Sequence, residues 1–255
     1  MKGNKILRNI LSLFDGISCG QIALNRRCNY YSSEIDKYAI KITQKNYPKT
    51  KQLGDVTTLK TFPKIFLLMG GSPCQDLSKL KNGKGLKGSK SSLIFEFKRI
   101  LTITKPKFFL LENVVPRKAE WIQDINKLMG VEGVVINSDL FVCQNRPRMY
   151  WTNIPISKLP ERPKWSKKYY QYRRTYFREN KSGVCPCLTA NMGTGGHNVP
   201  LTKKDLAFKL TPVDCERLQG IPDNYTEGVS NSQRYKMIGN AWTIPVIKHI
   251  FKGLK

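Results

Sequence analysis

The sequence predicts an α/β fold in which a doubly wound, mostly parallel sheet carries a second, smaller domain. Three observations support this prediction. Over residues 1–154, short apolar runs alternate with stretches of helical periodicity, as in chains of β-α-β units. Polar residues follow directly after several of these runs, where parallel sheets bind their ligands. After residue 154 the apolar periodicity weakens and a basic, aromatic segment begins.

The expected elements follow in order along the chain. Six short apolar runs predict strands, at residues 10–14, 30–33, 65–69, 108–111, 134–137 and 149–154. Apolar residues at helical spacing predict helices, at residues 21–27, 38–47 and 93–103. Pro48 and Pro106 lie just past the second and third of these, where a helix has to end. Globular patterning returns over residues 210–220, and the last of it covers residues 238–251.

The predicted domain boundaries fall at residues 154 and 204. Residues 1–154 form the main domain, residues 155–204 a small one, and residues 205–255 a return segment that completes the main domain. Within the small domain, residues 155–182 contain nine Lys or Arg, two acidic and six aromatic residues. Basic residues interleaved with aromatic ones suit phosphate contact and base stacking. The alternative is a solvated segment that orders only when it binds a partner.

The charge of the chain indicates a polyanionic partner. Its 255 residues include 44 Lys or Arg against 18 Asp or Glu, which gives a formal net charge of +26. A folded protein with this balance is expected to bind nucleic acid or an anionic membrane surface. No apolar run approaches the roughly 20 residues of a membrane-spanning helix. The basic N-terminal residues lack a following cleavage site, so no signal peptide is expected.

The cysteine and histidine content favours a reducing compartment without a metal site. Seven Cys, an odd number scattered over the chain, predict reduced thiols and a cytoplasmic location. Lys outnumbers Arg 31 to 13, which together with frequent Asn and Ile indicates an AT-rich genome and hence a bacterial cell or a phage-infected host. The only two His, His197 and His249, are far apart, which disfavours a zinc centre. Cys185 and Cys187 have no partner pair nearby and are interpreted as structural.

The segment Gly70-Gly71-Ser72-Pro73-Cys74 places a thiol on a glycine- and proline-shaped turn directly after an apolar strand. A catalytic thiol needs such a rigid and accessible position. The alternative is a buried structural cysteine. Residues 76–90 follow with five Lys, three Gly and one acidic residue. We interpret them either as a solvated loop or as a cationic loop that closes on a phosphate backbone.

A second polar position is Glu112, at the end of the predicted strand 108–111. A carboxyl group flanked by apolar residues there can act as a proton donor. The alternative is a carboxylate that caps the helix expected near Pro116.

The segment 11–20 has the order strand, glycine turn and helix, which suits an adenosine cofactor. Glu34 ends the next strand about twenty residues on, where a ribose-binding acid is expected. Asp55 supplies another acid in the following turn. A third glycine is missing from the turn, which disfavours a dinucleotide and favours a cofactor without a pyrophosphate.

Taken in order, these segments resemble the conserved motifs of the cytosine-C5 DNA methyltransferase family. The matching segments are Phe14-x-Gly16, Glu34-x-Asp36, Gly54-Asp55, Pro73-Cys74-Gln75, Glu112-Asn113-Val114, Gln144-Asn145-Arg146-Pro147-Arg148, Arg217-Leu218-Gln219-Gly220-Ile221-Pro222 and Gly239-Asn240-Ala241. The resemblance covers nearly the whole chain, and the residues of the motifs are most similar to those of the de novo subgroup. It implies a Rossmann-like, S-adenosylmethionine-dependent methyltransferase fold in which residues 155–204 are the target-recognition domain.

The resemblance also implies roles for individual residues. Cys74, Glu112 and Arg146 would be catalytic, and the substrate would be cytosine in double-stranded DNA. S-adenosylmethionine, released as S-adenosylhomocysteine, would be held by Phe14, Asp15, Gly16, Glu34, Ile35, Asp55, Val56, Leu93, Asn240 and Ala241. DNA would be contacted by Gln75, Ser78, Lys79, Arg148, Arg173, Arg174 and Thr189. The alternatives are a tRNA-methylating member of the same family and a catalytically inactive DNA-binding scaffold.

Overall fold

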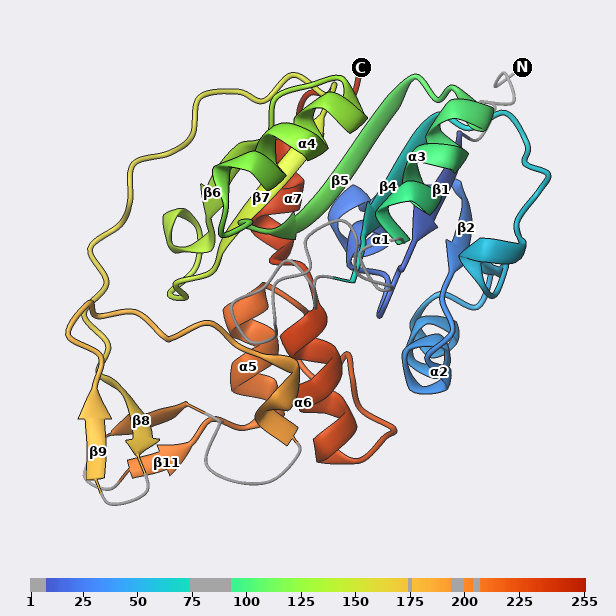
Figure 1. Cartoon of the computed structure of the whole chain (residues 1–255). Coiled ribbons are helices and arrows are strands. Elements are labelled where there is room, and N and C mark those ends of the chain that lie inside the picture. Colours follow the sequence, from blue (N-terminus) through green and yellow to red (C-terminus); the bar gives the residue numbers. More distant parts are fainter. Residues whose placement is uncertain (1–7, 74–92, 174–175, 194–199, 204–206) are drawn as a thin grey trace, which may run out of the picture.

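A computed structural model of the chain describes residues 8–73, 93–173, 176–193, 200–203 and 207–255. Its main feature is a seven-stranded sheet with the strand order β3-β2-β1-β4-β5-β7-β6 (Figure 1). The strands are β1 (Asn9–Leu13), β2 (Asn29–Ser33), β3 (Lys51–Gln52), β4 (Leu67–Gly71), β5 (Phe108–Val114), β6 (Val134–Asn137) and β7 (Pro147–Thr152). β7 runs antiparallel to both of its neighbours, and the remaining pairs are parallel. The predicted doubly wound, mostly parallel sheet is confirmed.

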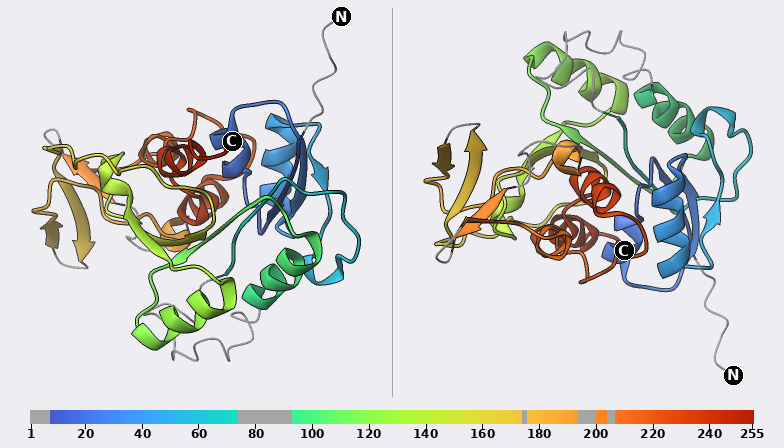
Figure 2. Two further views of the ribbon diagram at one scale, coloured as in Figure 1. Left: turned by 90° about the horizontal axis from the view of Figure 1, so that it is seen from above. Right: turned by 90° about the horizontal axis from the view of Figure 1, so that it is seen from below.

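Helices cover both faces of this sheet (Figure 2). One face carries α1 (Cys19–Leu24), α2 (Lys37–Asn46) and α7 (Ile244–Phe251), and the other carries α3 (Leu93–Thr104) and α4 (Ala119–Met129). Successive residues of a strand point to opposite faces. Accordingly, Phe108 and Leu110 pack with α1 and α7, whereas Phe109 and Leu111 pack with α3 and α4. We call the first of these faces the α7 face.

Two boundaries differ from the prediction in ways that matter for the site. The strand predicted at residues 108–111 continues to Val114, so Glu112 lies inside β5 and, by the same alternation, on the α7 face. Residues 238–251 do not form one continuous element. They contain the end of α6 (Asn231–Asn240) and all of α7. Pro245 in the first turn of α7 suits a helix start. The break places Ala241, Trp242 and Thr243 in a connection between the helices.

A second sheet lies to one side of the main one (Figure 1). Its four antiparallel strands are β8 (Tyr169–Arg173), β9 (Tyr176–Glu179), β10 (Leu201–Lys203) and β11 (Ala207–Lys209), in the order β11-β10-β8-β9. The basic, aromatic segment therefore contains a β-hairpin. The division of the chain at residues 154 and 204 stays a prediction.

The return segment begins with α5 (Pro212–Gln219), which opens with a capping box made by Thr211 and Asp214. The short helix η4 (Ala190–Gly193) packs against α6. Within the described residues, no helix is long and apolar enough to cross a membrane.

Candidate active site

The turn after β1 has an unusual backbone. Phe14 and Ser18, neither of them glycine, have φ angles of +55° and +58°, and Gly16 between them has +57°. Residues other than glycine rarely adopt this left-handed conformation, and it occurs often at functional sites. The amide of Gly16 donates to Glu34 Oε2 at 2.7 Å, which ties the turn to the end of β2.

Asp15 points inward from this turn. Tyr30 donates to its Oδ1 at 2.7 Å, and the Ser18 hydroxyl donates to its Oδ2. Burial raises the pKa of Asp15, although the surrounding hydroxyl groups oppose the shift. The carboxyl group therefore braces the turn from within, and the cofactor-binding role of Asp15 stays a prediction.

Glu34 and Ile35 form the next part of the site. Besides the Gly16 amide, Glu34 accepts the amides of Ile35 at 2.7 Å and Asp36 at 2.8 Å, both on Oε1. A carboxylate has about four acceptor positions, so these three bonds hold it in place and leave capacity for a hydroxyl group. The Ile35 side chain beside it is 73% exposed. This is an apolar surface at the carboxyl end of a parallel strand, where an adenine ring could stack.

The remaining residues expected at the cofactor lie at the same edge of the sheet or close to it. Asp55 caps the short helix η1 (Val56–Thr58), and Val56 is buried beneath it. Leu93 is partly buried at the start of α3. Asn240 is exposed at the end of α6, and Ala241 after it is buried. The acceptor at Glu34 and the open apolar surface at Ile35 fit an adenosine, so the residues present suit S-adenosylmethionine.

Glu112 is a buried carboxyl group on β5. Its Oε2 accepts the indole N–H of Trp242 at 3.0 Å, and its Oε1 lies 3.1 Å from Arg148 Nε. In the register of β4 and β5 it is paired with Gly71. Both Glu112 oxygens are therefore paired with donors from different parts of the chain.

The turn that leads to Cys74 is tied to the residue after Glu112. Asn113 Nδ2 donates to the Ser72 hydroxyl at 2.9 Å and to the Ser72 carbonyl at 3.2 Å. These bonds fix the end of β4 against β5. Cys74 itself lies outside the described residues, as do Gln75, Ser78, Lys79 and Arg174.

Arg146 and Arg148 have different surroundings. The buried Arg146 guanidinium donates to three carbonyl oxygens, of Leu188 at 2.7 Å, Gly239 at 3.0 Å and Ala241 at 2.8 Å. The catalytic role that the resemblance implies for Arg146 stays a prediction, and the structure shows its side chain holding backbone at Leu188 and at the end of α6. Burial opposes the charge of Arg148, yet Glu112, Cys187 and Tyr150 together outweigh burial and raise the pKa of that guanidinium. It is Arg148, not Arg146, that the structure places beside the carboxyl group.

Cys187 lies between the two arginines. Its sulfur is 3.5 Å from Arg146 Nη1 and 3.8 Å from Arg148 Nη2. Burial would raise the pKa of the thiol, but the two arginines outweigh it and lower the pKa. The sequence-based interpretation of Cys187 was structural, and Trp242 was not predicted to belong to the site. Neither contact with the site could be found from the spacing of residues in the sequence.

Two residues expected at DNA lie in the second half of the chain. Arg173 ends β8 in the small sheet. Thr189 is exposed, and its backbone lies directly against α6, because a Cβ built on Gly239 would be 2.2 Å from the Thr189 carbonyl carbon.

Comparisons with known proteins agree with this geometry. The model of the family described as C-5 cytosine-specific DNA methylase matches residues 8–155 and 118–255. The chain is 30% identical to the type II methyltransferase M.Bsp6I of Bacillus sp. (strain RFL6), over 96% of this chain and 98% of that protein. It is 27% identical to the type II methyltransferase M.NlaX of Neisseria lactamica, over 96% of each.

Solved structures share the fold. The Entamoeba histolytica methyltransferase EhMeth superimposes with a TM-score of 0.74 at 16% identity, over 98% of both chains. The S. pombe Dnmt2 methyltransferase gives 0.68 at 16% identity, over 97% of this chain and 98% of that one. At this identity the likeness concerns the fold alone.

Proposed function

The chain belongs to the C-5 cytosine-specific DNA methylase family and is a DNA cytosine-5 methyltransferase, and we propose that it acts on a cytosine flipped out of double-stranded DNA, through a covalent bond to Cys74. The observation that carries the proposal is the placement of Glu112. Glu112 is a buried carboxyl group with donors on both oxygens. It is paired with Gly71, the last residue of β4, and Gly71 precedes Cys74 by three residues.

The cofactor site would lie at the carboxyl ends of β1 and β2. Glu34 would accept a ribose hydroxyl, and the exposed Ile35 would stack on the adenine. When bound there, S-adenosylmethionine supplies an electrophilic methyl group and leaves as S-adenosylhomocysteine.

The residues of the chain would make C5 nucleophilic. The Cys74 thiolate forms a bond to C6 of the ring, and protonated Glu112 donates its proton to N3, which converts the ring to a neutral enamine. Arg148, which lies beside Glu112, would hold the O2 side of the base and support the carboxylate that results. We therefore propose that Arg148, and not Arg146, makes this contact with the base.

The ring is restored after C5 has gained the methyl group. A base removes the C5 proton, the C5=C6 double bond reforms and the C6–S bond breaks. The N3 proton returns to Glu112, so the enzyme ends in its starting state. Each bond that forms at C6 or N3 is broken again, and only the methyl group and the C5 proton are exchanged.

The substrate would reach this site outside the DNA stack. Within a duplex, C6 and N3 are enclosed by stacking and pairing, so the base has to rotate out before Cys74 can attack. The cationic residues 76–90 and the basic residues 155–182 would hold the opened duplex from two sides.

The test offers duplex DNA and a cofactor that is labelled on its methyl group. Transfer of label to cytosine is expected, with loss of transfer in Cys74→Ala. DNA containing 5-fluorocytosine should form a covalent complex, because fluorine cannot leave C5 as a proton does. Label that persists in Cys74→Ala would contradict the covalent mechanism.

A competition assay separates the alternatives. With tRNA and duplex DNA offered together, label in DNA is expected. Label that enters tRNA alone would identify the tRNA-methylating branch. No label in either substrate would support the alternative of a catalytically inactive DNA-binding scaffold.

A further inference from the structure

Trp242 contacts Glu112 from a part of the chain that no catalytic step uses. We propose that Trp242 is a positioning residue, whose indole N–H fixes the orientation in which Glu112 meets the base. The proposal rests on the proposed role of Glu112 as proton donor.

The contact is short and buried. Trp242 Nε1 lies 3.0 Å from Glu112 Oε2, and the two residues are each 8% exposed. In such surroundings water cannot replace the indole as a donor, so loss of the N–H would leave Oε2 without a partner. The residues are 130 positions apart in the sequence, and the connection between α6 and α7 brings them together.

Gly71 makes the room for this contact. A Cβ built on Gly71 would be 2.8 Å from Trp242 Nε1 and 3.0 Å from Glu112 Oε2. Real Cβ atoms essentially never come within 3.0 Å of another atom, so any larger residue would displace the indole and press on the carboxyl group. The indole therefore lies against the strand that leads to Cys74 and against the strand that carries Glu112.

Glu112 already has a donor on its other oxygen, Oε1, and the indole donor on Oε2 adds control over the orientation of the carboxyl group. Arg148 Nε holds Oε1 at 3.1 Å. A carboxyl group held at one oxygen can still rotate about its last bond, which has a broad torsional preference. With a donor on each oxygen, the plane of the group is defined, and its proton can be presented to N3 in one direction only.

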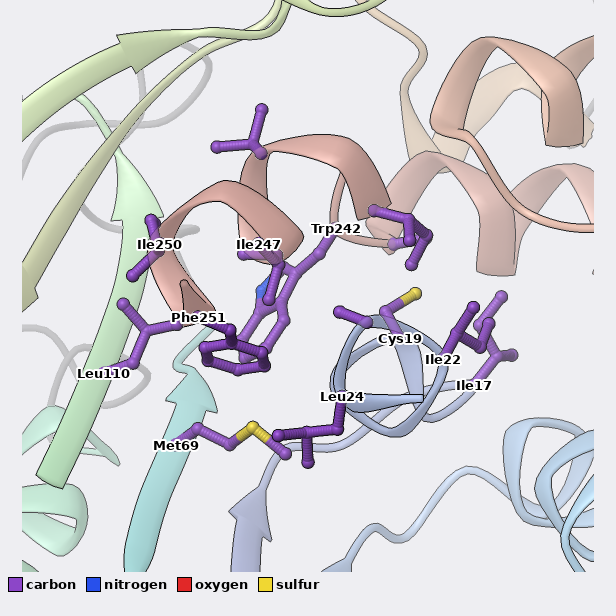
Figure 3. Close-up of a cluster of buried hydrophobic side chains, with 14 of the residues drawn as sticks. Ile17, Cys19, Ile22, Leu24, Met69, Leu110, Trp242, Ile247, Ile250 and Phe251 are labelled. Carbon is purple, nitrogen blue, oxygen red and sulfur yellow. The ribbon is translucent and has the colours of Figure 1, made fainter. Parts of the chain in front are cut away.

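The rest of the indole packs in the hydrophobic cluster of the α7 face, which includes Met69, Ile247 and Phe251 (Figure 3). Trp242→Phe retains an aromatic ring for that packing and removes the N–H. The variant therefore separates the hydrogen bond from most of the buried surface.

Trp151 provides a matched control. It is fully buried, and its indole N–H donates to Asn126 Oδ1 at 2.7 Å. It lies in β7 but packs on the opposite face of the sheet, away from Glu112. Trp151→Phe thus loses a buried indole hydrogen bond without touching the site.

The experiment measures kcat and KM for methyl transfer to duplex DNA at saturating cofactor. Trp242→Phe should lower kcat about tenfold or more, with KM for DNA changed less than about threefold, whereas Trp151→Phe should keep kcat within about twofold. In a Glu112→Gln background, Trp242→Phe should lower kcat by less than about twofold, because the carboxylate that the indole orients is gone.

Three outcomes would overturn the proposal: an unchanged kcat in Trp242→Phe, an equal loss in Trp151→Phe, or the same loss with and without Glu112. If Trp242→Phe does not fold, Gly71→Ala tests the same contact, and its kcat should fall without a matching rise in KM. Failure of the wild-type enzyme to label DNA would count against the proposed function, which keeps the two failures distinct.

Discussion

Arg146 and Gly239, 93 residues apart in the sequence, are joined by a hydrogen bond of 3.0 Å from the guanidinium to the carbonyl oxygen. The same guanidinium also holds the carbonyls of Leu188 and Ala241. Arg146 therefore connects the strand region of the main sheet, the segment before η4 and the end of α6. The planar, forked geometry of arginine suits this task, and lysine cannot reproduce it.

The two arginines of the site should respond differently to substitution by lysine. Arg146→Lys should lower the free energy of unfolding by about 3 kcal/mol, because each buried carbonyl left without a donor costs about 1–3 kcal/mol. Arg148→Lys should cost less stability and lower kcat about tenfold or more, since its partner is Glu112. Denaturant unfolding and steady-state kinetics of both variants check this contrast, and the reverse pattern would contradict it.

Gly239→Ala should destabilise the protein by about 3 kcal/mol. The new Cβ would lie 2.2–2.5 Å from backbone atoms of Thr189 and Ala190, which cannot move independently of their segment. Gly20→Ala is the control, since its Cβ would meet mainly the flexible end of Met69. Thermal unfolding of the two variants should give a clear loss for Gly239→Ala and a change within about 1 kcal/mol for Gly20→Ala.

Ile35→Ala should weaken cofactor binding without affecting the fold. The side chain is 73% exposed, so its removal should change the free energy of unfolding by less than about 0.5 kcal/mol. The affinity for S-adenosylmethionine should fall about tenfold if the side chain stacks on the adenine. Titration calorimetry measures the affinity, and Ile103→Ala, 51% exposed on α3, should leave it unchanged.

The ion pair between Asp36 and Lys236 should make stability depend on pH. Burial opposes the charge of Asp36, but Lys236 at 2.8 Å and the first amides of α2 outweigh it and lower the pKa. A lowered pKa stabilises the fold above the unfolded value, near pH 4, and the contribution is lost as the pH falls below it.

Asp36→Asn tests this, since asparagine also caps helices. Because both side chains are partly exposed, the wild type should exceed the variant by only about 0.2–1 kcal/mol at pH 7. The difference should shrink as the pH falls below about 4 and vanish at pH values where Asp36 is protonated in the folded protein as well. A difference that persists there would assign the effect to the cap and not to the charge.

The affinity for duplex DNA should fall steeply with salt. Nine basic residues lie in 155–182 and five in 76–90. If about six of them contact phosphates, the slope of log K against log salt should be about −5. Fluorescence anisotropy over a range of salt concentrations measures the slope, and a flat response would place the contacts elsewhere on the protein.

Most of the fold could be predicted from local patterns. The buried runs at β1, β4 and β5 and the alternation between strands and helices are visible in the sequence. The antiparallel direction of β7 is not, because a strand's direction is set by the path of the chain around it. The split between α6 and α7 was also missed, since both helices contribute apolar residues at similar spacing.

The site was predicted less completely than the fold. Motif order indicated Glu112, Glu34 and Cys74, and the structure describes the first two, Glu112 inside β5 and Glu34 directly after β2. It could not separate Arg146 from Arg148, which are two residues apart and of the same type. Nor could it assign Trp242 to Glu112, because nothing in the spacing of residues reports a contact across 130 positions.

By itself the sequence determined which runs form the strands and which polar residues stand near their ends, because burial and period-two alternation are local properties of a chain. Only the tertiary structure decided that Arg148 reaches Glu112, that Arg146 holds backbone instead, and that an indole completes the site. A buried donor pairs with whichever acceptor the packed chain brings within about 3 Å of it, and that choice is made by packing between segments distant in sequence.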